Sequence, residues 1–128
     1  MFDFVIDKKP SKKPVNLLLL YDSIIIGAGP GGANAALYAK RKGLDILLVT
    51  SKTGGQVLDT NLIENYLGII NTSGEKLNNL FTEHLESVDV PILNNSTVKK
   101  IKKNDDLFTL TLDNGKTLRS KSIILATG

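Results

Sequence analysis

The chain of 128 residues contains no cysteine, no tryptophan and only one histidine. Without cysteine it can form no disulfide, offer no thiolate to a metal ion and perform no thiol redox chemistry of its own. A single histidine without cysteine also argues against a structural zinc site, because the ligands of such sites come mostly from these two residue types. We therefore expect neither disulfides nor a metal site.

An excess of charge of one sign is also missing. The chain has 16 basic and 13 acidic residues, so its net charge is only +3, and the basic residues are scattered. Lys99, Lys100, Lys102 and Lys103 cluster, but no aromatic side chains are interleaved with them to stack on bases. We interpret these lysines as the exposed positions of a strand and expect no nucleic-acid partner.

Long apolar runs are absent too. Residues 17–26 come closest, but Tyr21, Asp22 and Ser23 interrupt them, and about 18 apolar residues are needed to cross a membrane. Basic residues precede this run, as in a signal peptide, yet the leucine run is short and no small-residue cleavage site follows it. We therefore expect a cytoplasmic protein that does not associate with membranes.

Glycines are concentrated directly after the first apolar strand, at residues 27–32. The pattern is Gly-x-Gly-x-x-Gly, with a β-branched strand (residues 21–26) before it and an alanine-rich helix (residues 33–41) after it. In dinucleotide-binding βαβ units the first glycine permits the tight turn, the second lets the backbone approach a pyrophosphate, and the third lets the helix pack on the sheet. A purely structural turn is the alternative, but the flanking strand and helix favour dinucleotide binding.

The rest of the chain is typical of an α/β domain. Residues 1–20, with Pro10 and Pro14, are expected to be an arm or linker. The first helix should end at Gly43, a buried strand should cover residues 44–49, and residues 51–68 form a loop long enough to suggest a function.

The second half begins with a helix. Thr72 and Glu75 fit a capping box, and the helix that follows places five apolar side chains on one face: Leu77, Leu80, Phe81, Leu85 and Val88. A short strand at residues 90–93 precedes an antiparallel meander of residues 97–103, 107–112 and 117–121, with a turn at Asn114 and Gly115. Residues 122–126 then form a last buried strand with no covering helix after it, which suggests an incomplete domain.

Four motifs follow one another along the chain: Gly-Ala-Gly-Pro-Gly-Gly (27–32), Gly-Gly-Gln-Val-Leu-Asp-Thr (54–60), Ile-Glu-Asn (63–65) and Ser-Ile-Ile-Leu-Ala-Thr-Gly (122–128). In this order and spacing they resemble the first half of the FAD domain in the thioredoxin reductase family. The wording of residues 54–60 is especially similar to the alkyl hydroperoxide reductase flavoproteins. The resemblance covers residues 21–128. It implies a Rossmann-like, three-layer α/β FAD-binding domain with a parallel sheet, helices and a small antiparallel meander, incomplete at its C-terminus.

The resemblance also implies a set of contacts with FAD. The glycine turn would bind the pyrophosphate, the loop that follows the second strand would lie beside the flavin, and backbone near Val98 would meet the adenine. The residues implied in cofactor binding are Gly27, Gly29, Pro30, Gly31, Gly32, Ser51, Gly54, Gly55, Gln56, Thr60, Asn65, Val98, Ala126, Thr127 and Gly128. No residue of the chain is expected to be catalytic.

Ser51 departs from the family pattern. An acidic residue commonly ends the second strand and holds the ribose hydroxyls, but Ser51 and Lys52 stand there. A hydroxyl is a weaker acceptor than a carboxylate. For this reason, and because the family's closing Gly-Asp turn over the flavin is missing, we expect the isolated chain to retain FAD weakly.

In the family, electrons pass from NAD(P)H through FAD to a redox disulfide. The resemblance therefore implies NAD(P)H in a domain beyond this segment, a thioredoxin-like or peroxiredoxin protein as substrate, and a homodimer for the full-length enzyme. In disulfide-reducing members that domain carries a Cys-x-x-Cys pair, so this chain alone is expected to be inactive. A cysteine-free ferredoxin or flavodoxin–NADP reductase of the same fold, or a non-catalytic nucleotide-binding module, are the alternatives.

Simpler interpretations stand beside several candidate residues. Glu64 has the chemistry of a general base, but a solvated or capping carboxylate fits it better. His84 lies on a mixed helix face without an evident partner, so we expect a solvated side chain. Asn65 fits a turn as well as a cofactor contact, and the loop with Gly54 and Gly55 has an ordinary surface loop as its alternative.

Overall fold

The computed structural model describes residues 14–128, and residues 1–13 lie outside the described part of the chain. Its first sheet contains, in spatial order, β4 (Ile92–Leu93), β3 (Ile46–Val49), β2 (Ser23–Ile26) and β8 (Ile123–Leu125). All neighbouring strands in this sheet run parallel, with Ile25 level with Leu48 and Ile124. Their carboxyl ends therefore share one edge, where doubly wound α/β proteins bind ligands.

The second sheet contains the predicted antiparallel meander and one additional strand. Its members are β5 (Val98–Asn104), β6 (Leu107–Leu112), β7 (Thr117–Ser120) and β1 (Leu20–Tyr21). β1 lies at its edge and pairs parallel with β7. The turn between β6 and β7 forms at Gly115, whose φ is +82° and whose N–H donates to the carbonyl of Leu112.

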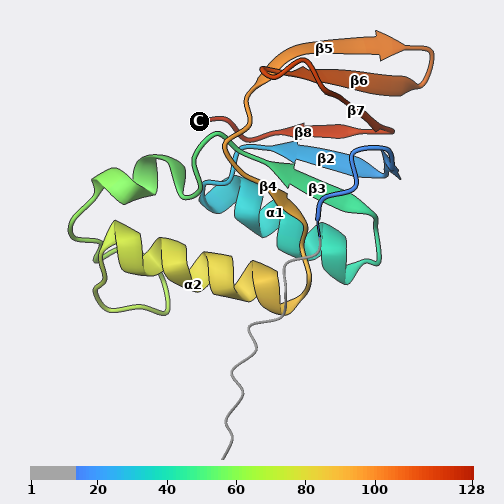
Figure 1. The fold of residues 1–128 in the computed structure, drawn as a ribbon. Coiled ribbons are helices and arrows are strands. Elements are labelled where there is room, and N and C mark those ends of the chain that lie inside the picture. The colour runs from blue at the N-terminus through green and yellow to red at the C-terminus, as the bar shows by residue number, and fades with distance from the viewer. Residues whose placement is uncertain (1–13) are drawn as a thin grey trace, which may run out of the picture.

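Two α-helices cover the face of the parallel sheet opposite the meander (Figure 1). α1 (Pro30–Arg41) begins with Pro30 in its first turn and ends before Gly43, whose φ of +80° suits the left-handed position after a helix. α2 (Gly74–Ser87) packs against α1. The meander, the parallel sheet and the helices form three layers, so the predicted three-layer α/β fold is confirmed.

Alternation along the central strands produces two separate cores. Ile24 and Ile26 of β2 point toward the meander, where they pack with Leu110 and Leu118. Ile25, between them, points the other way and packs with alanines of α1 and with Leu85 of α2. The run of three isoleucines therefore fills both faces of the sheet, which explains why the strand is apolar throughout rather than alternating.

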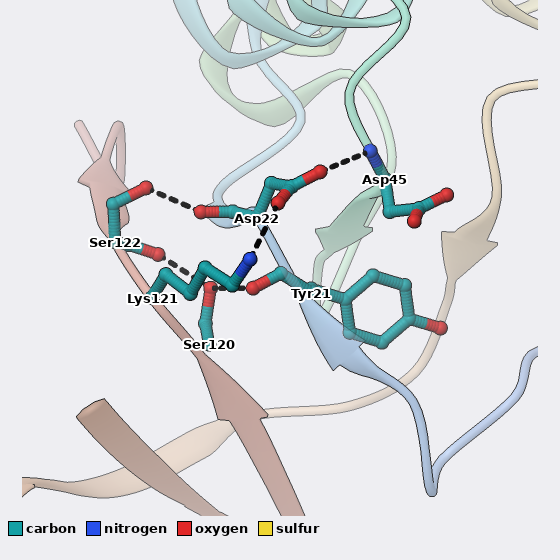
Figure 2. Close-up of polar contacts among 6 residues, drawn as sticks. All are labelled: Tyr21, Asp22, Asp45, Ser120, Lys121 and Ser122. Atoms are coloured by element: carbon teal, nitrogen blue, oxygen red, sulfur yellow. Dashed lines mark hydrogen bonds and ion pairs between the residues drawn. The ribbon is translucent and has the colours of Figure 1, made fainter.

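Both chain segments that pass between the two sheets do so at one junction (Figure 2). β1 leads to β2 through Asp22, and β7 leads to β8 through Lys121 and Ser122. The Lys121 ammonium lies 3.3 Å from an Asp22 carboxylate oxygen, and the Ser122 hydroxyl donates to the Asp22 carbonyl at 2.6 Å. The other Asp22 carboxylate oxygen accepts the N–H of Asp45 at 2.8 Å, which ties the start of β3 to the same point.

The sequence did not predict this junction. Residues 21–26 were expected to form one strand, but the chain leaves the second sheet after Tyr21 and enters the first at Ser23. Residues 14–20 also differ from the expected arm, because Val15, Leu17 and Leu19 pack against the core on the meander side.

The start of α2 differs from the prediction by one residue. The N-cap is Ser73, whose hydroxyl oxygen accepts the N–H of Lys76 at 3.2 Å, so the prediction of a capping box at Thr72 was wrong. Both residues have the chemistry of a cap, and Ser73 has the extended backbone that the position requires. Leu77 and Leu85 are buried as predicted, whereas Leu80 is 51% exposed.

Strand β8 is less buried than its sequence indicates. Ile124 is 39% exposed and Leu125 is 67% exposed. Among the strands of residues 14–128, β8 pairs only with β2 and lies at the edge of its sheet. The prediction of a buried last strand was therefore wrong for these two side chains.

Candidate dinucleotide-binding site

The glycine turn lies where β2 ends, at the carboxyl edge of the parallel sheet. Gly27 has a φ of +106°, and its N–H donates to the carbonyl of Val49 at 2.9 Å. A Cβ at Gly27 would lie 2.1 Å from the carbonyl oxygen of Ala126, and a Cβ at Gly32 would lie 1.7 Å from that of Gly27. Contacts within the protein therefore require these two glycines, as predicted from the sequence for the turn and for helix–sheet packing.

Gly29 and Gly31 differ, because a Cβ at either would meet no atom within 4 Å. Gly29 is the N-cap of α1, no side chain caps this helix end, and its first turn contains no acidic residue. The first N–H groups of a helix have no partner within it, and together they carry partial positive charge. Open space over such donors, bordered by glycine, suits a pyrophosphate, so the residues present fit the dinucleotide that the sequence implies.

The loop after β3 forms a second wall of this space. It contains the 3₁₀ helix η1 (Gly55–Asp59), and the N–H of Gly54 donates to the carbonyl of Ala28 at 3.2 Å. A Cβ at Gly55 would lie 3.6 Å from the Cα of Gly29. The structure thus brings Gly54 and Gly55 to the glycine turn, with Gln56 exposed immediately after them.

A third wall lies between the two sheets, where a cavity of about 280 Å³ opens beside the ends of β2 and β8. Val98 and Thr127, two of the sequence-predicted residues, line this cavity together. Its other lining residues are Ile26, Lys99, Lys100, Ile101 and Leu125. The sequence analysis assigned the two lysines to solvent. A bulge between Val98 and Lys100 shifts the register of β5, and strand alternation alone does not reveal it.

Other predicted residues are placed apart from the turn. Asn65 and Glu64 belong to a hairpin closed by paired hydrogen bonds between Ile63 and Thr72, and they line a hollow of about 490 Å³ formed by residues 64–70. Ser51 is exposed at the end of β3. Next to it, the Thr50 hydroxyl donates to the carbonyl of Lys52 and accepts its N–H. Thr60 is also exposed, but its carbonyl accepts the N–H of Gly74 at 2.8 Å.

Two further searches concern residues 14–128 as a whole. Nowhere in this part of the chain do three histidine, cysteine or acidic side chains gather in a way that could hold a metal ion. Within the same residues, neither helix has the length and apolar character that crossing a membrane requires. His84 is exposed near the end of α2.

A parallel sheet that delivers a glycine turn to an uncapped helix N-terminus defines a dinucleotide-binding domain of the Rossmann type. The sequence pattern of the pyridine nucleotide-disulphide oxidoreductases matches residues 21–128, and the chain belongs to this family. Its relatives are oxidoreductases, and the resemblance to thioredoxin reductases found in the sequence is confirmed.

Individual relatives show how much of a longer protein the chain represents. It is 44% identical over 108 residues to a Bacillus subtilis NADH dehydrogenase and 38% identical to an alkyl hydroperoxide reductase of Staphylococcus aureus. Each match covers 84% of this chain and 21% of the relative. The thioredoxin reductase of Streptococcus pyogenes superposes with a TM-score of 0.81 at 36% identity, covering 85% of this chain and 35% of that one. The chain therefore spans about a fifth of these curated relatives.

Proposed function

We propose that this chain is the FAD-binding segment of an NAD(P)H-dependent flavoprotein that reduces a redox disulfide. The observation that carries the proposal is the open space over Gly29 and Gly31 at the uncapped N-terminus of α1. Bound FAD would supply the capacity to accept a hydride from NAD(P)H and to pass electrons on to a disulfide. The family membership and the similarity to thioredoxin reductases support this assignment.

Each wall of the site has a proposed task. The N–H groups at the start of α1 hold the pyrophosphate, and the Gly54–Gly55 turn lets the backbone lie close to the ribityl chain. Gln56 and Asn65 offer amide donors and acceptors to the flavin, while the Ser51 hydroxyl faces the adenosine ribose. Val98 and Thr127 border the cavity at the adenine end.

The wider assignments follow from the relatives. We propose that the complete protein acts on a thioredoxin-like protein or a peroxiredoxin, forms a homodimer and works in the cytoplasm, with NAD(P)H bound by a further domain. The similarity to an alkyl hydroperoxide reductase favours a peroxiredoxin among these partners. In this arrangement the segment of 128 residues binds the cofactor, and residues outside it carry the disulfide.

Binding of FAD to the chain, measured by flavin fluorescence anisotropy, tests the proposal. Gly29→Ala should fold normally, because its Cβ meets no protein atom, yet it should weaken FAD binding about 10-fold or more by occupying the space over the helix terminus. Thr117→Ala, an exposed change in β7, is the control and should bind as the original chain does. Equal affinity in Gly29→Ala, or no binding by the original chain at millimolar FAD, would overturn the proposal.

A further inference from the structure

The loop that carries Gly54, Gly55 and Gln56 lies between two parts of the molecule. On one side it meets the glycine turn, through the hydrogen bond from Gly54 to Ala28 and the close approach of Gly55 to Gly29. On its other side lies α2, whose packing against η1 is part of the fold. The position of the loop relative to the glycine turn therefore depends on what α2 does.

Two residues of α2 make this contact. At the first, Gly74, the N–H donates to the carbonyl of Thr60 at 2.8 Å, and a Cβ would lie 1.7 Å from the carbonyl oxygen of Val57. One turn later, the amide group of Asn78 lies over Gly54, because a Cβ on Gly54 would be 2.8 Å from both Cγ and Oδ1 of Asn78. The two contacts hold opposite ends of the segment from Gly54 to Thr60.

The backbone of Gly54 explains why such support is needed. Gly54 is buried with a φ of +95°, and Gly55 follows with a φ of +54°. Two consecutive glycines in the left-handed region have much conformational freedom to lose, so an unsupported turn of this kind would sample many conformations. A half-buried side chain packed on Gly54 removes that freedom.

We propose that Asn78 and Gly74 are positioning residues of the cofactor site, which hold the segment from Gly54 to Thr60 at its distance from the glycine turn. The inference rests on the proposed function, because it assumes that this segment meets the flavin. Neither residue is expected to touch the cofactor. Loss of the support should weaken binding of ligands that reach the loop and spare ligands that reach only the glycine turn.

Asn78→Ala tests the proposal with two ligands. ADP carries the pyrophosphate but no flavin, so its affinity should stay within about 2-fold of the original chain, whereas FAD affinity should fall about 5- to 10-fold. Asn79→Ala is the matched control, because Asn79 is the same residue type, exposed and next in the helix. It should change neither affinity. Gly74→Ala should show the same split more strongly if it folds.

Hydrogen exchange provides a readout that needs no cofactor. In Asn78→Ala the amides of residues 54–60 should exchange at least about 5-fold faster, while those of β2 and β3 keep their protection. Asn78→Leu retains most of the side-chain volume and should restore slower exchange, since the contact with Gly54 is one of packing.

The outcomes separate the inference from the proposed function. If the original chain binds FAD and Asn78→Ala binds both ligands equally well, the inference is wrong and the proposed function stands. A uniform loss of ADP and FAD binding also overturns it, because that pattern indicates general destabilisation. If the original chain binds neither ligand, the proposed function fails, and unchanged exchange at residues 54–60 in Asn78→Ala then overturns the positioning role as well.

Discussion

The glycine turn contains glycines that are required for two different reasons. At Gly27 and Gly32 the protein itself leaves no room for a side chain, whereas at Gly29 and Gly31 the protein leaves open space. A motif of spaced glycines does not separate these reasons, since each position is simply glycine in the sequence. Substitution does separate them, because only the first kind of glycine should affect folding.

Gly32→Ala should therefore destabilise the fold strongly. Its Cβ would lie 1.7 Å from the backbone carbonyl of Gly27, so α1 would have to move away from the sheet. We expect a loss of about 3 kcal/mol in the free energy of unfolding, in the range of overpacked core substitutions. Urea denaturation of the chain without ligand measures it.

Gly31→Ala is the matched control on the same turn. Its Cβ meets no atom within 4 Å, and alanine favours a helix over glycine, so unfolding should become harder by about 0.5 kcal/mol. Equal destabilisation by the two substitutions would show that the helix and strand pack differently from this structure.

At the residue scale the sequence predicted the parts of the site that depend on local backbone. Gly27 and Gly32 behave as the motif requires, and Gly54 and Gly55 do reach the turn. Asn78 was not predicted, because its contact with Gly54 joins residues 24 positions apart and leaves no local pattern. Assignments that depend on the ligand, such as those of Ser51 and Asn65, remain predictions.

At the scale of elements, helix ends show where sequence rules are ambiguous. Thr72 and Ser73 both have hydroxyl side chains, and only the backbone conformation decides which one caps α2. The two buried strands β2 and β3 were predictable, because apolar runs flanked by glycines fix them. The passage of the chain between sheets at Asp22 was not, because β1 and β2 adjoin without a turn signal.

Ser73→Ala should remove the cap of α2. The hydroxyl that accepts the Lys76 N–H would be lost, which costs about 1 kcal/mol and lowers Tm by roughly 4 °C in a domain of this size. Thr72→Ala is the comparison, since Thr72 makes only a 3.4 Å contact with the Ser73 carbonyl. Differential scanning calorimetry of both variants decides between the two caps, and a larger loss at Thr72 would favour the assignment made from the sequence.

At the scale of the whole molecule, the two sheets are joined where β1 passes to β2 and β7 passes to β8 (Figure 2). The N–H of Lys121 donates to the Tyr21 carbonyl at 2.9 Å, and the Ser120 hydroxyl donates to the Ser122 carbonyl at 2.6 Å. Segments about 100 residues apart in sequence meet there, so the junction forms only when both sheets are in place. Contacts of such long range are absent from any local pattern, which is why the sequence predicted the layers but not how they are tied together.

The charged group at this junction makes stability depend on pH. The Asp45 N–H and then the Lys121 ammonium lower the pKa of Asp22 below its ordinary value of 3.8. A carboxylate whose pKa falls on folding stabilises the native state above its unfolded pKa, and this contribution is lost as the pH drops through the folded pKa. Asp22→Asn should therefore lower Tm at pH 7, and the difference from the original chain should shrink progressively below about pH 4. Thermal unfolding followed by circular dichroism between about pH 2 and 7 measures this, with Asp106→Asn, in the exposed β5–β6 turn, as the control for the same change in charge. A difference in Tm that stays constant across this range would mean that the Asp22 carboxylate does not hold the two sheets together through its charge.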